Sequence, residues 1–130
     1  MTGYIVTWVR GFCLGSFLVL AVASPVSAHH SFGMFDHTQV TSVTGVVKSF
    51  QWTNPHTWLQ VVVTDNKGKS VEWSFEGGSP GILSRHGWKR TVVKSGDKVT
   101  VLFNPLKDGS PGGSFVEVKT PDGKTYFYHG

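Results

Sequence analysis

Cysteine is almost missing from this sequence, since Cys13 is the only one among 130 residues. It stands at the start of an apolar stretch, ahead of the part of the chain that is expected to fold. A folded domain after this stretch has no disulfide, and it can use neither a thiolate metal ligand nor a cysteine nucleophile. Its stability must come from packing, and a transition-metal site in it must use nitrogen and oxygen ligands.

Strong catalytic motifs are also missing. The sequence contains no His-Glu-x-x-His zinc motif and neither of the glycine-rich patterns that bind phosphates. Acidic residues are few, eight against twelve lysines and arginines, and several stand in predicted turns. We therefore expect a binding protein that is not an enzyme.

Long hydrophobic runs are absent as well. The apolar run from Phe12 to Val22 is too short to cross a bilayer, which needs about 20 residues. It follows Arg10, and the small residue Ala28 comes shortly after it, as in a secretory signal peptide. We expect residues 1–28 to be cleaved after Ala28. Residues 29–130 would then form one periplasmic domain that starts at His29 and has no membrane anchor.

The basic residues are scattered rather than clustered. The formal net charge is +4 with neutral histidines, and the densest group, Arg85 to Lys94, is short. Nucleic-acid binding needs a concentrated basic face. We therefore expect no nucleic-acid partner.

Alternating apolar and polar residues predict a chain made mostly of strands. In 70–76, for example, Val71, Trp73 and Phe75 alternate with polar residues. A short helix is predicted at 79–87, because Ser79 can cap it and Gly87 can end it. The predicted strands cover residues 38–52, 56–64, 70–76, 98–103, 114–119 and 125–128.

Three strands, a short helix and then two or three strands is the element order of the OB-fold, a small Greek-key β-barrel. The first strand of such a barrel is long and often bent, and Gly45 predicts a bulge in it. The alternative is an immunoglobulin-like β-sandwich, which needs about seven strands and no helix after the third. We expect an all-β, OB-fold-like barrel.

Histidines form the first candidate site. Cleavage after Ala28 would give His29 a free amine beside its imidazole, followed directly by His30. Nitrogen ligands of this kind suit Cu(II), which binds most tightly among the first-row divalent ions. His56 or His37 would complete the set. A copper redox enzyme is a weaker alternative on the same residues.

Aromatic residues around a predicted loop form the second candidate site. Trp52, Asn54, His56 and Trp58 surround an Asn-Pro turn between the first two strands. In OB-folds this loop and the loop between strands four and five border the usual ligand face. With Trp88, these residues would bind a small molecule, a glycan or a protein. The oligomeric state is left open.

The glycine-rich start of the predicted helix forms a third, structural feature. Ile82, Leu83 and Trp88 are expected to plug one end of the barrel, and Glu76 is a candidate partner for Arg85.

A set of short motifs covers nearly all of the sequence after residue 28. They include Ala-His-His-Ser-Phe at 28–32, Gln-Trp-Thr-Asn-Pro-His at 51–56, Gly-Trp at 87–88 and Asn-Pro-Leu-Lys-Asp-Gly at 104–109. Together they resemble a family of small exported bacterial domains of unknown function. The resemblance implies export and one compact β-rich domain, and it implies no activity.

Overall fold

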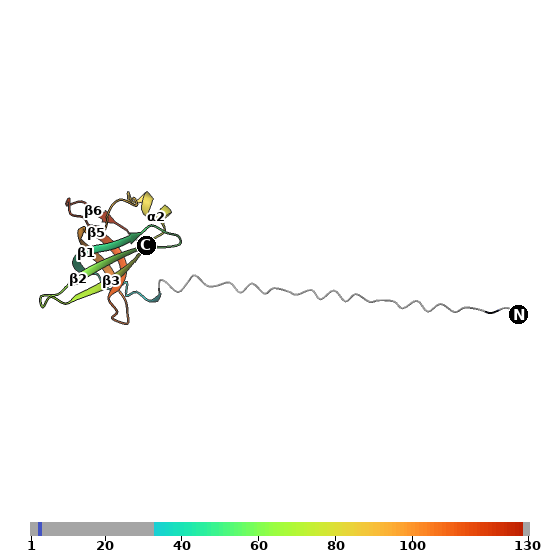
Figure 1. Cartoon of the computed structure of the whole chain (residues 1–130), viewed down its shortest axis with the longest axis horizontal. Helices are drawn as coiled ribbons and strands as arrows, with labels where there is room; N and C mark the ends of the chain where they lie inside the picture. The colour runs from blue at the N-terminus through green and yellow to red at the C-terminus, as the bar shows by residue number, and fades with distance from the viewer. Residues whose placement is uncertain (1–2, 4–32, 129–130) are drawn as a thin grey trace.

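The computed structural model describes residue 3 and residues 33–128, and the latter form the barrel shown in Figure 1. Six strands and one short helix follow one another along this part of the chain. Their bounds are β1 Thr41–Gln51, β2 Thr57–Thr64, β3 Ser70–Gly77, α2 Pro80–Arg85, β4 Lys98–Pro105, β5 Gly112–Lys119 and β6 Thr125–Phe127. No helix in the described residues is long and apolar enough to cross a membrane.

Strands β1 to β5 close into a five-stranded barrel. The strand order is β3-β2-β1-β4-β5-β6, and β5 also pairs with β3 in parallel. Strand β6 adds to β5 outside this closure. A closed barrel with its helix between the third and fourth strands is the OB-fold arrangement, so the predicted fold class is confirmed. A sandwich of two separate sheets is excluded.

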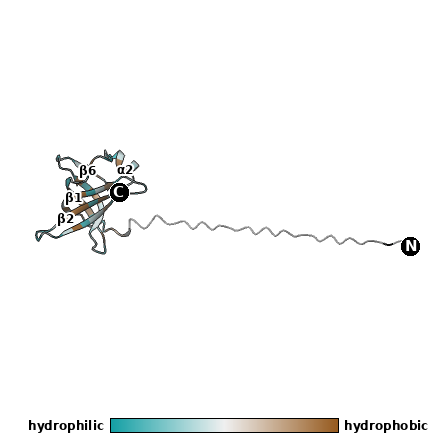
Figure 2. Ribbon diagram, in the orientation of Figure 1, coloured by the Kyte–Doolittle hydropathy of each residue, from teal (hydrophilic) through white to brown (hydrophobic). Residues whose placement is uncertain are grey.

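The inward positions of the strands build the core. Leu59 and Val61 of β2, Phe75 of β3 and Phe103 of β4 are at most 1% exposed. The rings of Phe75 and Phe103 lie 4.8 Å apart, in the range for a favourable aromatic pair. Figure 2 shows apolar residues along the strands and hydrophilic ones in the loops. The core is therefore the interior of the barrel itself.

The bulge in β1 lies at Lys48, so its prediction at Gly45 is wrong. Val47 pairs with Val61 of β2, but Ser49 pairs with Gln60, which leaves Lys48 as the extra residue. The inward phase of β1 therefore changes after Val47. A side chain at Gly45 would instead collide with β2, because its Cβ would lie 2.5 Å from the carbonyl oxygen of Val62. The glycine permits close packing of the two strands.

Helix α2 has the capping residues that the sequence predicts. The Ser79 hydroxyl accepts a hydrogen bond from the Ile82 amide at 3.3 Å, and Pro80 occupies the first turn. Gly87, just after the helix, has a φ of 81°, which favours glycine. Leu83 is buried and Ile82 is 41% exposed, so Leu83 contributes to the barrel plug and Ile82 does so only in part.

The barrel closes at a glycine-rich contact between β3 and β5, called here the β3–β5 seam. Only three residue pairs form it, Ser74–Gly112, Phe75–Gly113 and Glu76–Ser114. A Cβ on Gly112 would lie 2.2 Å from the carbonyl oxygen of Ser74. Strand β5 starts two residues before its predicted start because these glycines pair with β3.

The segment 33–39 runs beside the loop between β4 and β5. Phe35 is 5% exposed and forms an isolated bridge with Leu106. The Lys107 amide donates to the Met34 carbonyl at 3.0 Å, and the Lys107 ammonium donates to the Gly33 carbonyl at 2.8 Å. The start of the described barrel is thus fixed against the β4–β5 loop.

Candidate functional site

The loop between β1 and β2 contains the first part of the candidate site. The Asn54–Pro55 bond is cis, and the Thr53 hydroxyl donates to the carbonyl of His56 at 3.1 Å. Thr57 begins β2, and both its amide and its hydroxyl donate to the carbonyl of Gly78. These bonds hold the loop against the end of β3 and bring His56 next to it.

A histidine–carboxylate pair lies where this loop meets β3. The Nδ1 atom of His56 contacts the Oε1 atom of Glu76. The Glu76 side chain is only 8% exposed and that of His56 is 27% exposed. A buried carboxylate without a partner destabilises the folded state. The contact with His56 therefore stabilises the fold, and it also positions the imidazole ring. With Nδ1 engaged, Nε2 is the ring nitrogen available to a ligand.

The same carboxylate also influences Tyr128. Burial raises the pKa of the Tyr128 hydroxyl, and the negative charge of Glu76 raises that pKa further. Tyr128 is 6% exposed and its ring packs against Gly78, directly after β3. Tyr128 is therefore a buried phenol whose hydroxyl is influenced by the Glu76 charge.

A cavity of about 360 Å³ opens beside the pair and is called here the His56 pocket. Its volume lies within the usual range for small-ligand sites. Pro55 and Trp58 supply apolar surface, while amides, a hydroxyl and the histidine–carboxylate pair supply polar groups. The lining residues are Gln51, Thr53, Asn54, Pro55, His56, Trp58 and Glu76.

The structure brings together three of the residues predicted to bind a ligand. Asn54, His56 and Trp58 all line the His56 pocket. Trp52 does not line it; this half-buried side chain packs on the core, with its ring 5.6 Å from that of Phe50.

Trp88 lies inside the barrel and not on a ligand face. Its side chain is 1% exposed, and its indole nitrogen donates to the carbonyl of Phe127 at 3.0 Å. It contributes to the plug that the sequence predicts and offers no surface to a ligand.

The predicted metal ligands fall in three places. His56 lines the pocket, and exposed His37 lies on segment 33–39 with its ring 6.2 Å from that of Phe35. His37 and His56 are therefore at opposite ends of β1. His29, His30 and the cleavage position Ala28 lie outside the described residues. Within residues 33–128, no group of three or more histidines, cysteines and carboxylates is arranged to hold a metal ion.

Glu76 and Gln51 are the pocket residues that sequence reasoning missed. Glu76 pairs with His56 rather than with Arg85, the partner considered from the sequence. The position of Glu76 could have been found from the register of the β2–β3 hairpin. Thr64 pairs with Ser70 next to the turn, and six further pairs along the two strands place Glu76 opposite Trp58. A residue opposite Trp58 is close to His56, two positions away.

Ser79 lies in the sequence Gly-Gly-Ser-Pro-Gly at residues 77–81, which matches the Gly-x-Ser-x-Gly pattern of a nucleophile elbow. The Ser79 hydroxyl is the helix cap, and its φ of −62° is relaxed rather than strained. The structure thus gives this serine a capping role.

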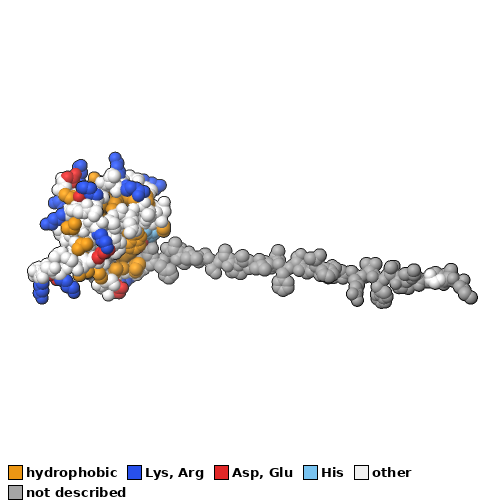
Figure 3. All heavy atoms as spheres, in the orientation of Figure 1, with side chains coloured by type: hydrophobic (Ala, Val, Ile, Leu, Met, Phe, Trp, Pro, Cys, Tyr) orange, Lys and Arg blue, Asp and Glu red, His pale blue; other side chains and the backbone are white. Residues whose placement is uncertain are grey.

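Charged side chains form no single dominant patch on the face of the barrel shown in Figure 3. On the face shown in Figure 3, lysines and arginines are distributed around the body. This agrees with their scattered positions in the sequence.

Comparisons with known proteins give a family but no functional relative. Residues 17–115 match the family described as "Family of unknown function (DUF6152)". No curated protein and no solved structure matches the chain.

Proposed function

We propose that this chain, which belongs to the family of unknown function DUF6152, is an exported binding protein whose ligand site is the His56 pocket. The observation that carries the proposal is the contact between His56 Nδ1 and the buried Glu76 carboxylate. The contact fixes the orientation of the imidazole and leaves its second nitrogen available to a ligand. The site is therefore organised before a ligand arrives.

A transition metal, copper foremost, is the ligand that this arrangement favours. Metal-binding histidines usually donate their other ring N–H to a carboxylate or carbonyl, which fixes the tautomer and increases ligand basicity. His56 and Glu76 have this relationship. The remaining ligands would be His29, through its amine and imidazole, and His30. His37 is the alternative to His56.

Export supplies the ligands that the barrel lacks. Cleavage after Ala28 in the periplasm would free the His29 amine, four residues before Gly33. An extended tether of this length spans at most about 14 Å. Gly33 lies beside the β4–β5 loop, and that loop ends at Gly112, which pairs with Ser74 of β3. His37 lies on the segment that this tether leads into, whereas His56 lies beyond the far end of β1, so His37 is the histidine that the tether reaches most directly.

Copper binding is expected to be tighter than micromolar in protein whose N-terminus has been made by export. Intact mass identifies the first residue, and isothermal titration with Cu(II) measures the affinity. Replacing both His29 and His30 with alanine, or His56 with asparagine, should weaken binding at least tenfold. Glu76→Gln should weaken it about 10–100-fold, because it removes the carboxylate behind the ligand.

His86→Asn is the matched control, since His86 is exposed and does not line the pocket. It should bind copper like the parent protein. A His37→Asn variant decides which histidine completes the site. Absent binding, or equal binding without His29 and His30, would remove copper from the proposal.

A small organic ligand is the second candidate, favoured by the volume of the pocket and by its Pro55 and Trp58 walls. In this case a saccharide titrated in the presence of EDTA is expected to quench tryptophan fluorescence. Trp58→Ala should abolish the quenching because this ring lines the pocket, and Trp52→Phe should not. Quenching that persists in Trp58→Ala, or none with any mono- or oligosaccharide tested, counts against this candidate.

A further inference from the structure

A second cavity lies on the outer face of β1, β4 and β5, away from the His56 pocket. Thr44 of β1 pairs with Thr100 of β4, and Thr100 pairs with Lys119 of β5. Lys98 is two residues before Thr100 and therefore points to the same face of the strand. The cavity measures about 350 Å³ and is called here the Lys98 cavity. Its lining residues are Thr44, Lys98, Val99, Thr100, Lys119, Thr120 and Pro121.

Two lysines are among the lining residues of this cavity, and none of the lining residues is a carboxylate. Lys98 and Lys119 are both exposed, and neither forms an ion pair with another residue in the described range. Glu117 is on the same face of β5 as Lys119, but it is outside the lining and forms no ion pair with that lysine. Two ammonium groups thus remain uncompensated at the cavity.

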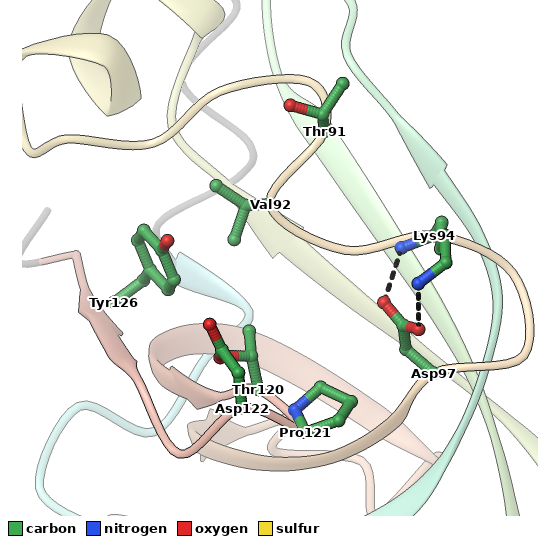
Figure 4. A pocket seen from close by; sticks show the side chains of 8 residues that line it. All are labelled: Thr91, Val92, Lys94, Asp97, Thr120, Pro121, Asp122 and Tyr126. Carbon is green, nitrogen blue, oxygen red and sulfur yellow. Dashed lines mark hydrogen bonds and ion pairs between the residues drawn. The ribbon is translucent and has the colours of Figure 1, made fainter.

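The carboxylates of the adjoining cavity are already paired with other groups. That cavity shares Thr120 and Pro121 with the Lys98 cavity and is drawn in Figure 4. Asp97 accepts hydrogen bonds from the Lys94 ammonium at 2.7 Å and from the Lys94 amide at 3.0 Å. Asp122 accepts from the Thr120 hydroxyl at 2.5 Å and contacts the Lys124 ammonium at 3.1 Å.

These bonds also keep Asp122 ionised. They lower its pKa from 3.8 to about 2, chiefly through the Thr120 hydroxyl. Asp97 and Asp122 therefore interact with their own partners and do not compensate the charges of Lys98 and Lys119.

The two threonines add one hydroxyl donor to this cavity. The hydroxyl oxygens of Thr44 and Thr100 lie 2.9 Å apart and share one hydrogen bond. Each hydroxyl has one proton, so the one that accepts in this bond can donate its proton elsewhere. A cavity with two ammoniums and a hydroxyl donor is complementary to a tetrahedral oxyanion, for which lysine is a common point-charge partner.

We propose that the Lys98 cavity is a binding site for a phosphate-type oxyanion. The recognised chemistry is a singly or doubly charged phosphoryl group, which can belong to free phosphate or to the headgroup of an anionic lipid. This site is independent of the His56 pocket, so its failure leaves the proposed function untouched.

The test is an amide NMR titration with inorganic phosphate at constant ionic strength, using chloride as the reference anion. The amides of Thr44, Thr100 and Lys119 are expected to shift with saturation. A Lys98→Gln/Lys119→Gln variant should bind at least tenfold more weakly. Lys67→Gln/Lys69→Gln is the matched control because it removes the same charge from the exposed β2–β3 turn, outside the cavity.

A second arm uses vesicles of phosphatidylglycerol mixed with phosphatidylcholine, with pure phosphatidylcholine as the reference. Saturable phosphate binding that is lost in the Lys98→Gln/Lys119→Gln variant assigns the site to a free anion. Binding to the anionic vesicles alone, lost in the same variant, assigns it to a lipid headgroup. Failure of both probes, or equal losses in the two double variants, overturns the proposal. Thermal unfolding of each variant confirms that it is folded.

Discussion

Replacing Trp88 with alanine is expected to lower the free energy of unfolding by about 3–5 kcal/mol. The side chain is 1% exposed, and its ring lies 5.1 Å from that of Phe115 and 5.4 Å from that of Tyr126. The substitution leaves a cavity where these rings meet. It also removes the indole donor from the carbonyl of Phe127. Urea denaturation followed by circular dichroism measures the loss.

Trp58→Ala provides the comparison, because Trp58 is only half-buried and lines the His56 pocket. Its removal should cost much less stability and should affect ligand binding instead. A loss below about 1 kcal/mol in Trp88→Ala would contradict a core role for this tryptophan. It would instead support the sequence-based prediction that Trp88 contributes to a ligand-binding surface.

Gly113→Ala is expected to destabilise the barrel by about 1–3 kcal/mol or more, the usual cost of overpacking. A Cβ at this position would lie 2.1 Å from the carbonyl oxygen of Asn104 and 2.6 Å from the ring of Phe103. The first obstacle is backbone, so no side-chain rotation relieves it. The added methyl must push β5 away from β4, next to the β3–β5 seam.

Hydrogen exchange should show where this effect acts. Amides of β3 and β5 near the seam should exchange faster in Gly113→Ala, while those of the β1–β2 pairing should change less. Gly81→Ala is the opposite control, since it lies in α2 with space for a methyl. There alanine should raise stability by about 0.5–1 kcal/mol. Equal free energies of unfolding for Gly113→Ala and the parent protein would contradict this prediction. They would mean that the strands around the β3–β5 seam can shift to make room for a methyl group.

The fold could be predicted where the signal is local. Alternation in β3 and the capping residues Ser79 and Gly87 are properties of short segments, and the element order follows from them. The bulge could not be placed, because Lys48 becomes the extra residue only through the pairing of β1 with β2. The start of β5 was missed because Gly112 and Gly113 carry no side-chain pattern.

For the candidate site too, the residues that are neighbours in the sequence could be predicted, and those brought in by strand pairing could not. Asn54, His56 and Trp58 are neighbours in the sequence, so a turn between strands was enough to group them. Glu76 belongs to another strand and reaches His56 only through the hairpin register. Trp88 was assigned to a ligand face because composition reveals an aromatic ring but not its burial. His29 and His30 remain predictions, since their role depends on processing.

The location of the His56 pocket has a consequence for assembly. Its lining comes from β1, the loop after it, β2 and β3, which follow one another along the chain and pair antiparallel. Such neighbours can meet after closing only short loops. The seam instead joins β3 to β5 across α2 and β4, a contact of longer range that slows folding. The meander β1–β2–β3, which carries the His56 pocket, can therefore form as an early folding unit, with closure of the barrel as the later event.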